Sequence, residues 1–152
     1  MYKALPLISV LLLPTALFAG ESDDMAAIRQ AALDYIESQH NVSPDRMETA
    51  IHKQLAKRTY WKRQDQDEFV METDYDTMVK VAETYNKNGD SFPEKPRKEI
   101  EILDIDGRVA SVKLTADDWI DYMHLFKNDN GEWKIINVLW QYHDKAKHIS
   151  RQ

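Results

Sequence analysis

Residues 119–140, which read WIDYMHLFKNDNGEWKIINVLW, decide the fold of this chain. Two runs rich in aromatic and β-branched residues, 119–127 and 132–140, flank a turn that ends in Asn130-Gly131. Such runs around an Asn-Gly turn predict a β-hairpin. The same residues, being the densest apolar stretch, indicate where a ligand could sit.

The segment before this hairpin predicts a second one. Residues 98–105 and 108–115 alternate with period two and flank Asp106-Gly107, a strong two-residue turn signal. A further turn at residues 116–118 joins the two hairpins. These four strands, linked by short turns, predict an antiparallel sheet.

Three helices are expected upstream of these strands. The first is capped by Asp23 or Asp24 and runs to about Gln39, the second starts at Ser43-Pro44, and the third opens at residues 73–76. Their apolar faces comprise Ile28, Ala32, Tyr35 and Ile36, then Met47, Ile51 and Leu55, then Met78, Val81, Ala82 and Tyr85. Residues 57–62 are either a short strand or the entrance to a loop, and residues 86–98 form a connector or a lid. The order predicts an α+β domain, with helices packed on one face of a curved antiparallel sheet.

The N-terminus has the pattern of a secretory signal, residues 1–19. Lys3 is followed by a short apolar run and by Leu17-Phe18-Ala19, with cleavage expected after Ala19 or Gly20. A membrane anchor is the alternative, but the run is too short for a span and contains two prolines. We therefore expect a periplasmic or secreted protein without a membrane attachment once the signal is removed. A single domain spans residues 23–143 and a polar tail spans residues 144–152.

Composition excludes several classes of function. The 152-residue chain has no cysteine, so disulfide frameworks and thiol catalysis are excluded. Its formal charge is −6, and loss of a signal whose only charged side chain is Lys3 leaves −7, which disfavours nucleic acid as a partner. The basic residues between Lys53 and Arg63 are interpreted as a solvated surface.

Side-chain alternation divides the hairpin into two faces. The face without formal charge should look inward, and it comprises Ile120, Tyr122, His124, Phe126, Trp133, Ile135, Asn137 and Leu139. Its polar members Tyr122, His124 and Asn137 either bind a small molecule or satisfy one another in a closed core. The other face, which includes Trp119, Met123, Ile136, Val138 and Trp140, suits a second copy of the sheet, so we expect a homodimer.

The same alternation places Asp121 and His124 on opposite faces, which argues against an acid–base dyad within this strand. Two other residues are candidate ligand contacts: Tyr35, whose ring is buried or lies at the rim, and His52, which is otherwise a surface residue. A three- or five-residue loop would change which faces of the two strands pair. The spacing of the five histidines predicts no metal site, and no cofactor-binding motif is present.

Several segments resemble one known family: Ala31-Ala32-Leu33-Asp34-Tyr35-Ile36 near the start, Leu55-Ala56-Lys57-Arg58, and Gly131-x-Trp133-Lys134-Ile135-Ile136-Asn137 near the end. The chain is similar to the putative lumazine-binding family of the nuclear transport factor 2-like, or SnoaL-like, superfamily. This resemblance implies a cone of three helices wrapped by a bent sheet around a pocket. The superfamily includes both enzymes and non-catalytic binding modules, so the fold does not decide the activity.

Two hypotheses follow for the function. In the first, an exported binding or accessory protein holds a small apolar or aromatic molecule inside the cone, contacted by Tyr35, His52, Tyr122 and Asn137. In the second, a SnoaL-like isomerase, cyclase or dehydratase uses His124 as a general base, with a Tyr or Asn polarising a carbonyl group.

Overall fold

The computed structural model describes residues 16–63 and 67–150, with side chains described from Asp23 onward. Most of the predicted signal, residues 1–15, lies outside the described residues. Within these ranges no helix is long and apolar enough to cross a membrane. The described elements are α1 (Ala16–His40), α2 (Pro44–Ala50), β1 (Ile51–Arg63), β2 (Glu68–Thr73), α3 (Tyr75–Thr84), β3 (Lys98–Asp106), β4 (Val109–Ala116), β5 (Trp119–Lys127), β6 (Trp133–Tyr142), the 3-10 helix η1 (Lys145–Lys147) and β7 (Ile149–Ser150).

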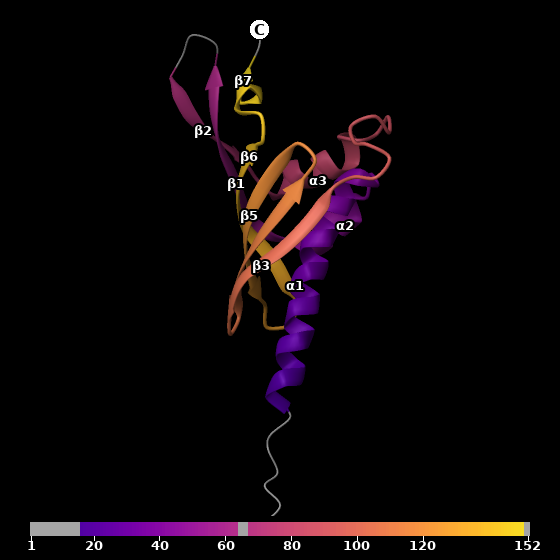
Figure 1. The fold of residues 1–152 in the computed structure, drawn as a ribbon, viewed down its shortest axis with the longest axis vertical. Coiled ribbons are helices and arrows are strands. Elements are labelled where there is room, and N and C mark those ends of the chain that lie inside the picture. The colour runs from indigo at the N-terminus through magenta and orange to yellow at the C-terminus, as the bar shows by residue number, and fades with distance from the viewer. Residues whose placement is uncertain (1–15, 64–66, 151–152) are drawn as a thin grey trace, which may run out of the picture.

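The α+β class and the packing of helices on a curved sheet are confirmed (Figure 1). The strand order is β2-β1-β6-β5-β4-β3, and β7 adds to β1. The sheet is mixed rather than wholly antiparallel as predicted, because β1 runs parallel to β6 and to β7. The predicted hairpins β3–β4 and β5–β6 are both present.

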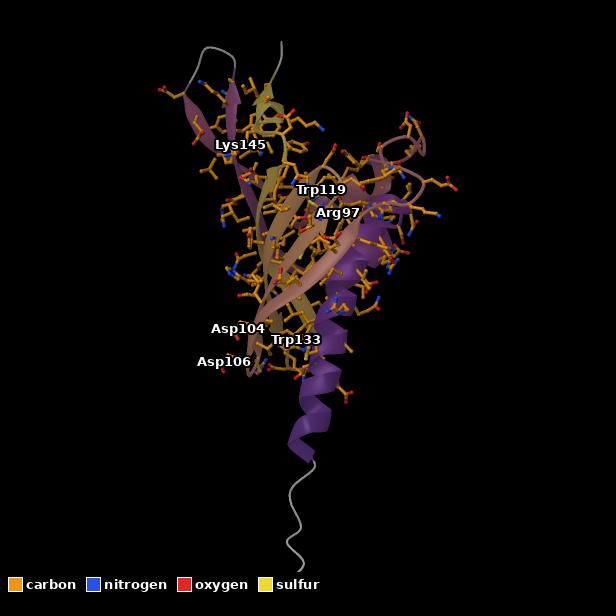
Figure 2. The ribbon with its side chains drawn as sticks, viewed as in Figure 1. Arg97, Asp104, Asp106, Trp119, Trp133 and Lys145 are labelled. Atoms are coloured by element: carbon orange, nitrogen blue, oxygen red, sulfur yellow. The ribbon has the colours of Figure 1, made fainter. Side chains whose placement is uncertain are left out.

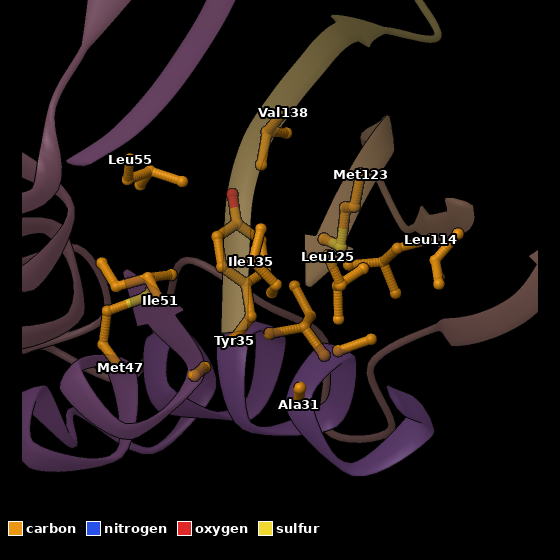
Figure 3. Close-up of a cluster of buried hydrophobic side chains, with 14 of the residues drawn as sticks. Ala31, Tyr35, Met47, Ile51, Leu55, Leu114, Met123, Leu125, Ile135 and Val138 are labelled. Carbon is orange, nitrogen blue, oxygen red and sulfur yellow. The ribbon is translucent and has the colours of Figure 1, made fainter. Parts of the chain in front are cut away.

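The core lies between α1 and the concave face of the sheet. Ile28, Ala32, Tyr35 and Ile36 of α1 are fully buried, as their helical spacing predicts. Figure 3 shows Tyr35 rising from α1 toward the sheet, where Ile135, Val138, Met123 and Leu125 lie in the same cluster.

The second helix is shorter than predicted. We expected Met47, Ile51 and Leu55 to share one helical face, but α2 ends at Ala50 and Ile51 begins a 13-residue strand. All three residues are buried in the structure, as they would be on one face of a helix. Their spacing alone therefore cannot distinguish a helix from a strand. The β-branched and aromatic run Thr59-Tyr60-Trp61 lies in the strand.

The third helix begins where its capping signal places it. Asp74 is the N-cap of α3, and its carboxylate accepts a hydrogen bond from the Thr77 backbone N–H at 2.9 Å. The loop after α3 is more than a connector, because the Phe92 ring packs against the rings of His40 and Trp119.

The C-terminal residues are not a free polar tail in the described part of the chain. The backbone N–H of Lys62 donates to the His148 carbonyl, and β7 pairs with the end of β1. His148 is buried, and its ring stacks on Tyr60 at 4.3 Å between ring centroids. Residues 144–150 therefore belong to the folded unit, at the end of the molecule where β2 also lies (Figure 1).

Candidate functional site

The prediction of which face of β5 points inward is wrong. Trp119, Asp121, Met123 and Leu125 are buried, whereas Tyr122 is 43% exposed. His124 is exposed as well and faces outward with Tyr122. The prediction assumed that the uncharged face looks inward, and it failed because the charge of Asp121 is matched by a buried cation.

The pairing with β6 explains the rest of the error. The loop between the strands spans Asn128 to Glu132, the five-residue case, so Trp133 and Ile135 face inward opposite Lys127 and Leu125. A bulge follows between the His124–Asn137 and Leu125–Ile135 pairs, leaving Ile136 as the extra residue. Beyond it the faces of β6 exchange, so Val138 is buried and Asn137 and Leu139 are exposed.

Tyr122, His124 and Asn137 do come together, but on the outer face of the sheet. They line a hollow of about 440 Å³ with Ala56, Arg58, Val138 and Leu139. His52 is half-buried on this same side, where its ring lies 5.2 Å from the Phe126 ring in an edge contact. Of the predicted site residues, Tyr35 is the one inside the cone.

The residue that Tyr35 meets there is a buried lysine. The Lys57 ammonium donates hydrogen bonds to the Tyr35 hydroxyl at 2.5 Å and to the Asp121 carboxylate at 2.9 Å. The other carboxylate oxygen of Asp121 accepts from the Trp119 indole N–H at 2.7 Å. We call Tyr35, Lys57, Trp119 and Asp121 the cone network.

The cone network is buried. The Asp121 side chain is 0% exposed and the Lys57 side chain is 8% exposed. Burial, together with the negative charge of Asp121, raises the pKa of the Tyr35 hydroxyl well above its ordinary value, so Tyr35 is a neutral phenol. A buried ammonium next to a buried carboxylate is an ion pair with one positive and one negative charge.

The cone network opens into a pocket between α3 and the sheet. Lys57 and Trp119 reach the pocket wall, whereas Tyr35 and Asp121 lie behind it. The volume is about 170 Å³, and the full lining is Gln39, Lys57, Thr73, Thr77, Met78, Val81, Tyr85, Trp119, Trp140 and Tyr142. We call this space the cone pocket. Trp119 lies near the α3 end of the molecule, while Trp133 lies toward the opposite end (Figure 2).

At the opposite end of the cone, a different carboxylate joins α1 to the β5–β6 hairpin. Asp24 of α1 accepts hydrogen bonds from the Lys127 ammonium at 2.7 Å and from the Trp133 indole at 3.0 Å. The hydrogen bond from Lys127, followed by that from Trp133, lowers the Asp24 pKa. This contact holds α1 on the β5–β6 hairpin.

Sequence reasoning missed Lys57 and Asp121. Lys57 was assigned to a solvated basic cluster and Asp121 to the outer face. The signal was present in the alternation Leu55-x-Lys57-x-Thr59, which places Lys57 on the same strand face as a buried leucine. The matching alternation on β5 is Trp119-x-Asp121-x-Met123-x-Leu125. Two opposite charges, each in line with apolar residues, indicate a buried pair.

The cone of helices and curved sheet is that of the nuclear transport factor 2-like class. A solved nuclear transport factor 2-like protein of unknown function from Shewanella baltica matches with a TM-score of 0.61 and 20% identity, over 80% of this chain and 95% of that one. A similar protein from Silicibacter pomeroyi gives a TM-score of 0.61 at 12% identity, over 81% and 98%. A putative scytalone dehydratase from Novosphingobium aromaticivorans gives 0.51 at 16% identity, over 82% and 87%. At these identities the likeness shows the fold alone.

The family of this chain is identified by comparing its sequence with family profiles. The profile of the putative lumazine-binding family matches residues 23–141, and the chain belongs to this family. Comparison with curated proteins found no match. The predicted family is therefore confirmed, and the solved structures show the predicted fold.

Proposed function

We propose that this protein binds a small aromatic molecule in the cone pocket. The observation that carries the proposal is the position of Lys57, which forms a buried ion pair with Asp121, at the wall of a pocket lined mostly by aromatic and apolar residues. A few placed polar groups among apolar residues are typical of small-molecule sites. The family description, putative lumazine-binding, also supports binding of a small heterocycle.

The size of the pocket restricts the ligand. Its volume of about 170 Å³ is close to that of an engineered cavity of about 150 Å³ that binds benzene, and below the range usual for drug-sized ligands. A ligand of one or two rings fits this space.

The test is identification of what the purified mature protein carries. The protein is denatured, the extract is analysed by mass spectrometry, and the recovered compound is returned to ligand-free protein in a thermal-shift assay. A one- or two-ring compound that raises the melting temperature is expected. If nothing is recovered and a broad panel of such compounds leaves the melting temperature unchanged, the proposal is wrong.

The alternative, an isomerase, cyclase or dehydratase with His124 as general base, loses its geometric support. His124 lies on the outer face of the sheet, away from the cone pocket. An activity located in the cone would instead have Lys57 as the charged group at the pocket wall. A His124→Ala variant is therefore expected to leave any reaction in the pocket unchanged.

We further propose that the chain is exported and dimeric. Export rests on the pattern of residues 1–19, and N-terminal sequencing of the protein from a periplasmic fraction should begin at Gly20 or Glu21. If the sequence instead begins at Met1, the signal is not cleaved.

The dimer uses a different face from the one predicted, because Trp119, Met123 and Val138 are buried. The outer face exposes Val109, Tyr122 and Leu139 instead.

A further inference from the structure

The Lys57 ammonium has an unused hydrogen-bond donor. A lysine ammonium carries three N–H donors. Two of these are taken by Tyr35 and Asp121, and no third acceptor is found among the described residues. Lys57 is one of the residues that line the cone pocket, so a ligand bound there can reach the ammonium.

The Trp140 ring forms the wall of the pocket beside the ammonium. The Lys57 ammonium lies over this ring, 4.9 Å from its centroid. The Trp140 indole nitrogen is buried within the wall and is not open to the pocket. A ligand ring packed here therefore meets an aromatic face and the ammonium together.

The charge balance favours a neutral acceptor. Asp121 already compensates the charge of Lys57 at 2.9 Å. A ligand carboxylate in the same pocket would be a second buried anion beside a single cation, and burying an uncompensated charge is costly. A carbonyl oxygen, which accepts hydrogen bonds without bringing charge, satisfies the ammonium at a lower desolvation cost.

We propose that the cone pocket selects neutral aromatic carbonyl compounds, with the carbonyl oxygen accepting from the Lys57 ammonium and the ring packed on the pocket's aromatic side chains. This inference rests on the proposed function and adds the ligand class and the residue that recognises it. Lys57 is the specificity-determining residue.

The experiment compares three probes of similar shape by NMR titration of the mature protein. Acetophenone carries a neutral carbonyl, ethylbenzene lacks the oxygen, and benzoate is an anion. In a purely apolar pocket the more hydrophobic ethylbenzene would bind more tightly than acetophenone. With hydrogen bonds to a charged donor, acetophenone should instead bind about tenfold more tightly than either other probe.

Two variants separate recognition from folding. The double variant Lys57→Met/Asp121→Leu removes both charges with side chains of similar size, and it should make ethylbenzene the tighter ligand. Trp133→Phe, at the other end of the cone, should leave the preference unchanged.

The outcomes distinguish the two proposals. If none of the probes binds, both fail. If ethylbenzene binds at least as tightly as acetophenone to the unchanged protein, the pocket stands but carbonyl recognition is wrong. If benzoate is the tightest ligand, the inference of a neutral ligand is overturned.

Discussion

At the scale of single residues, the Lys57–Asp121 pair is the feature on which stability depends most directly. In Asp121→Ala the Lys57 ammonium stays buried without its counter-charge. Removing one partner of a buried pair costs about 3–5 kcal/mol, so the free energy of unfolding in urea at pH 7 should fall by about that amount. The double variant Lys57→Met/Asp121→Leu should be more stable than Asp121→Ala, because it leaves no unpaired charge.

A surface pair provides the matched control. Arg58 is the next residue along β1, and its guanidinium contacts Glu72 at 2.7 Å with both side chains about half exposed. In Glu72→Ala the free energy of unfolding should change by less than about 1 kcal/mol. Equal losses for Asp121→Ala and Glu72→Ala would contradict the importance assigned to burial of the pair.

His148 makes stability depend on pH near neutrality. Its Nε2 accepts a hydrogen bond from the Tyr142 backbone N–H at 2.8 Å, which requires a neutral ring, and burial lowers its pKa. The unfolded chain therefore takes up a proton first as the pH falls below about 6.5. This contribution to stability is complete above pH 6.5 and is lost as the pH falls toward the lowered pKa of the folded protein.

Urea unfolding at pH 7.5 and pH 5.5 measures this effect. The urea concentration at the unfolding midpoint of the unchanged protein should be lower at pH 5.5 than at pH 7.5. In His148→Gln this decrease should be smaller. Some dependence should remain, because burial also lowers the pKa of His40. The same fall in both proteins would show that His148 does not titrate on unfolding.

At the scale of elements, the C-terminal segment 144–150 should behave as part of the sheet. The Trp61 indole donates to the Ser150 hydroxyl at 2.8 Å, and the His148 ring lies against Tyr60, Trp61 and Trp140. Truncation after His143 should therefore lower the melting temperature and shift tryptophan fluorescence to longer wavelength. Truncation after Ser150, which keeps every one of these contacts, is the control, and identical spectra for both truncations would contradict the assignment.

The elements also show what the sequence could predict. The Asp106-Gly107 and Asn130-Gly131 turns, the Asp74 region and the period of α1 were sufficient for two hairpins and two helix positions, because each is a local signal. The end of α2 and the direction of β1 were not predictable, since both depend on the parallel pairing of β1 with β6. The cone network required Lys57 and Asp121, which are 64 residues apart, to be matched across the fold.

At the scale of the whole molecule, the open outer face of the sheet should carry the contact between two copies. Leu139 is 62% exposed there, beside Tyr122 in the same cross-strand pair. Sedimentation velocity at micromolar concentration should give a dimer for the unchanged protein and a monomer for Leu139→Glu, because the interface would bury an unpaired charge. Val70→Glu, an exposed change on β2, should leave the dimer intact. A monomer for the unchanged protein would exclude this interface.

The indole N–H resonances of the tryptophans report whether the cone pocket binds a small aromatic molecule. Trp119 and Trp140 line the pocket, while Trp133 is held by Asp24 at the other end of the cone. In an NMR titration of the mature protein with acetophenone, the Trp119 and Trp140 signals should shift along one saturable curve and the Trp133 signal should stay in place. Saturable shifts of Trp133 alone, or no saturable shift of Trp119 and Trp140, would contradict binding in the cone pocket.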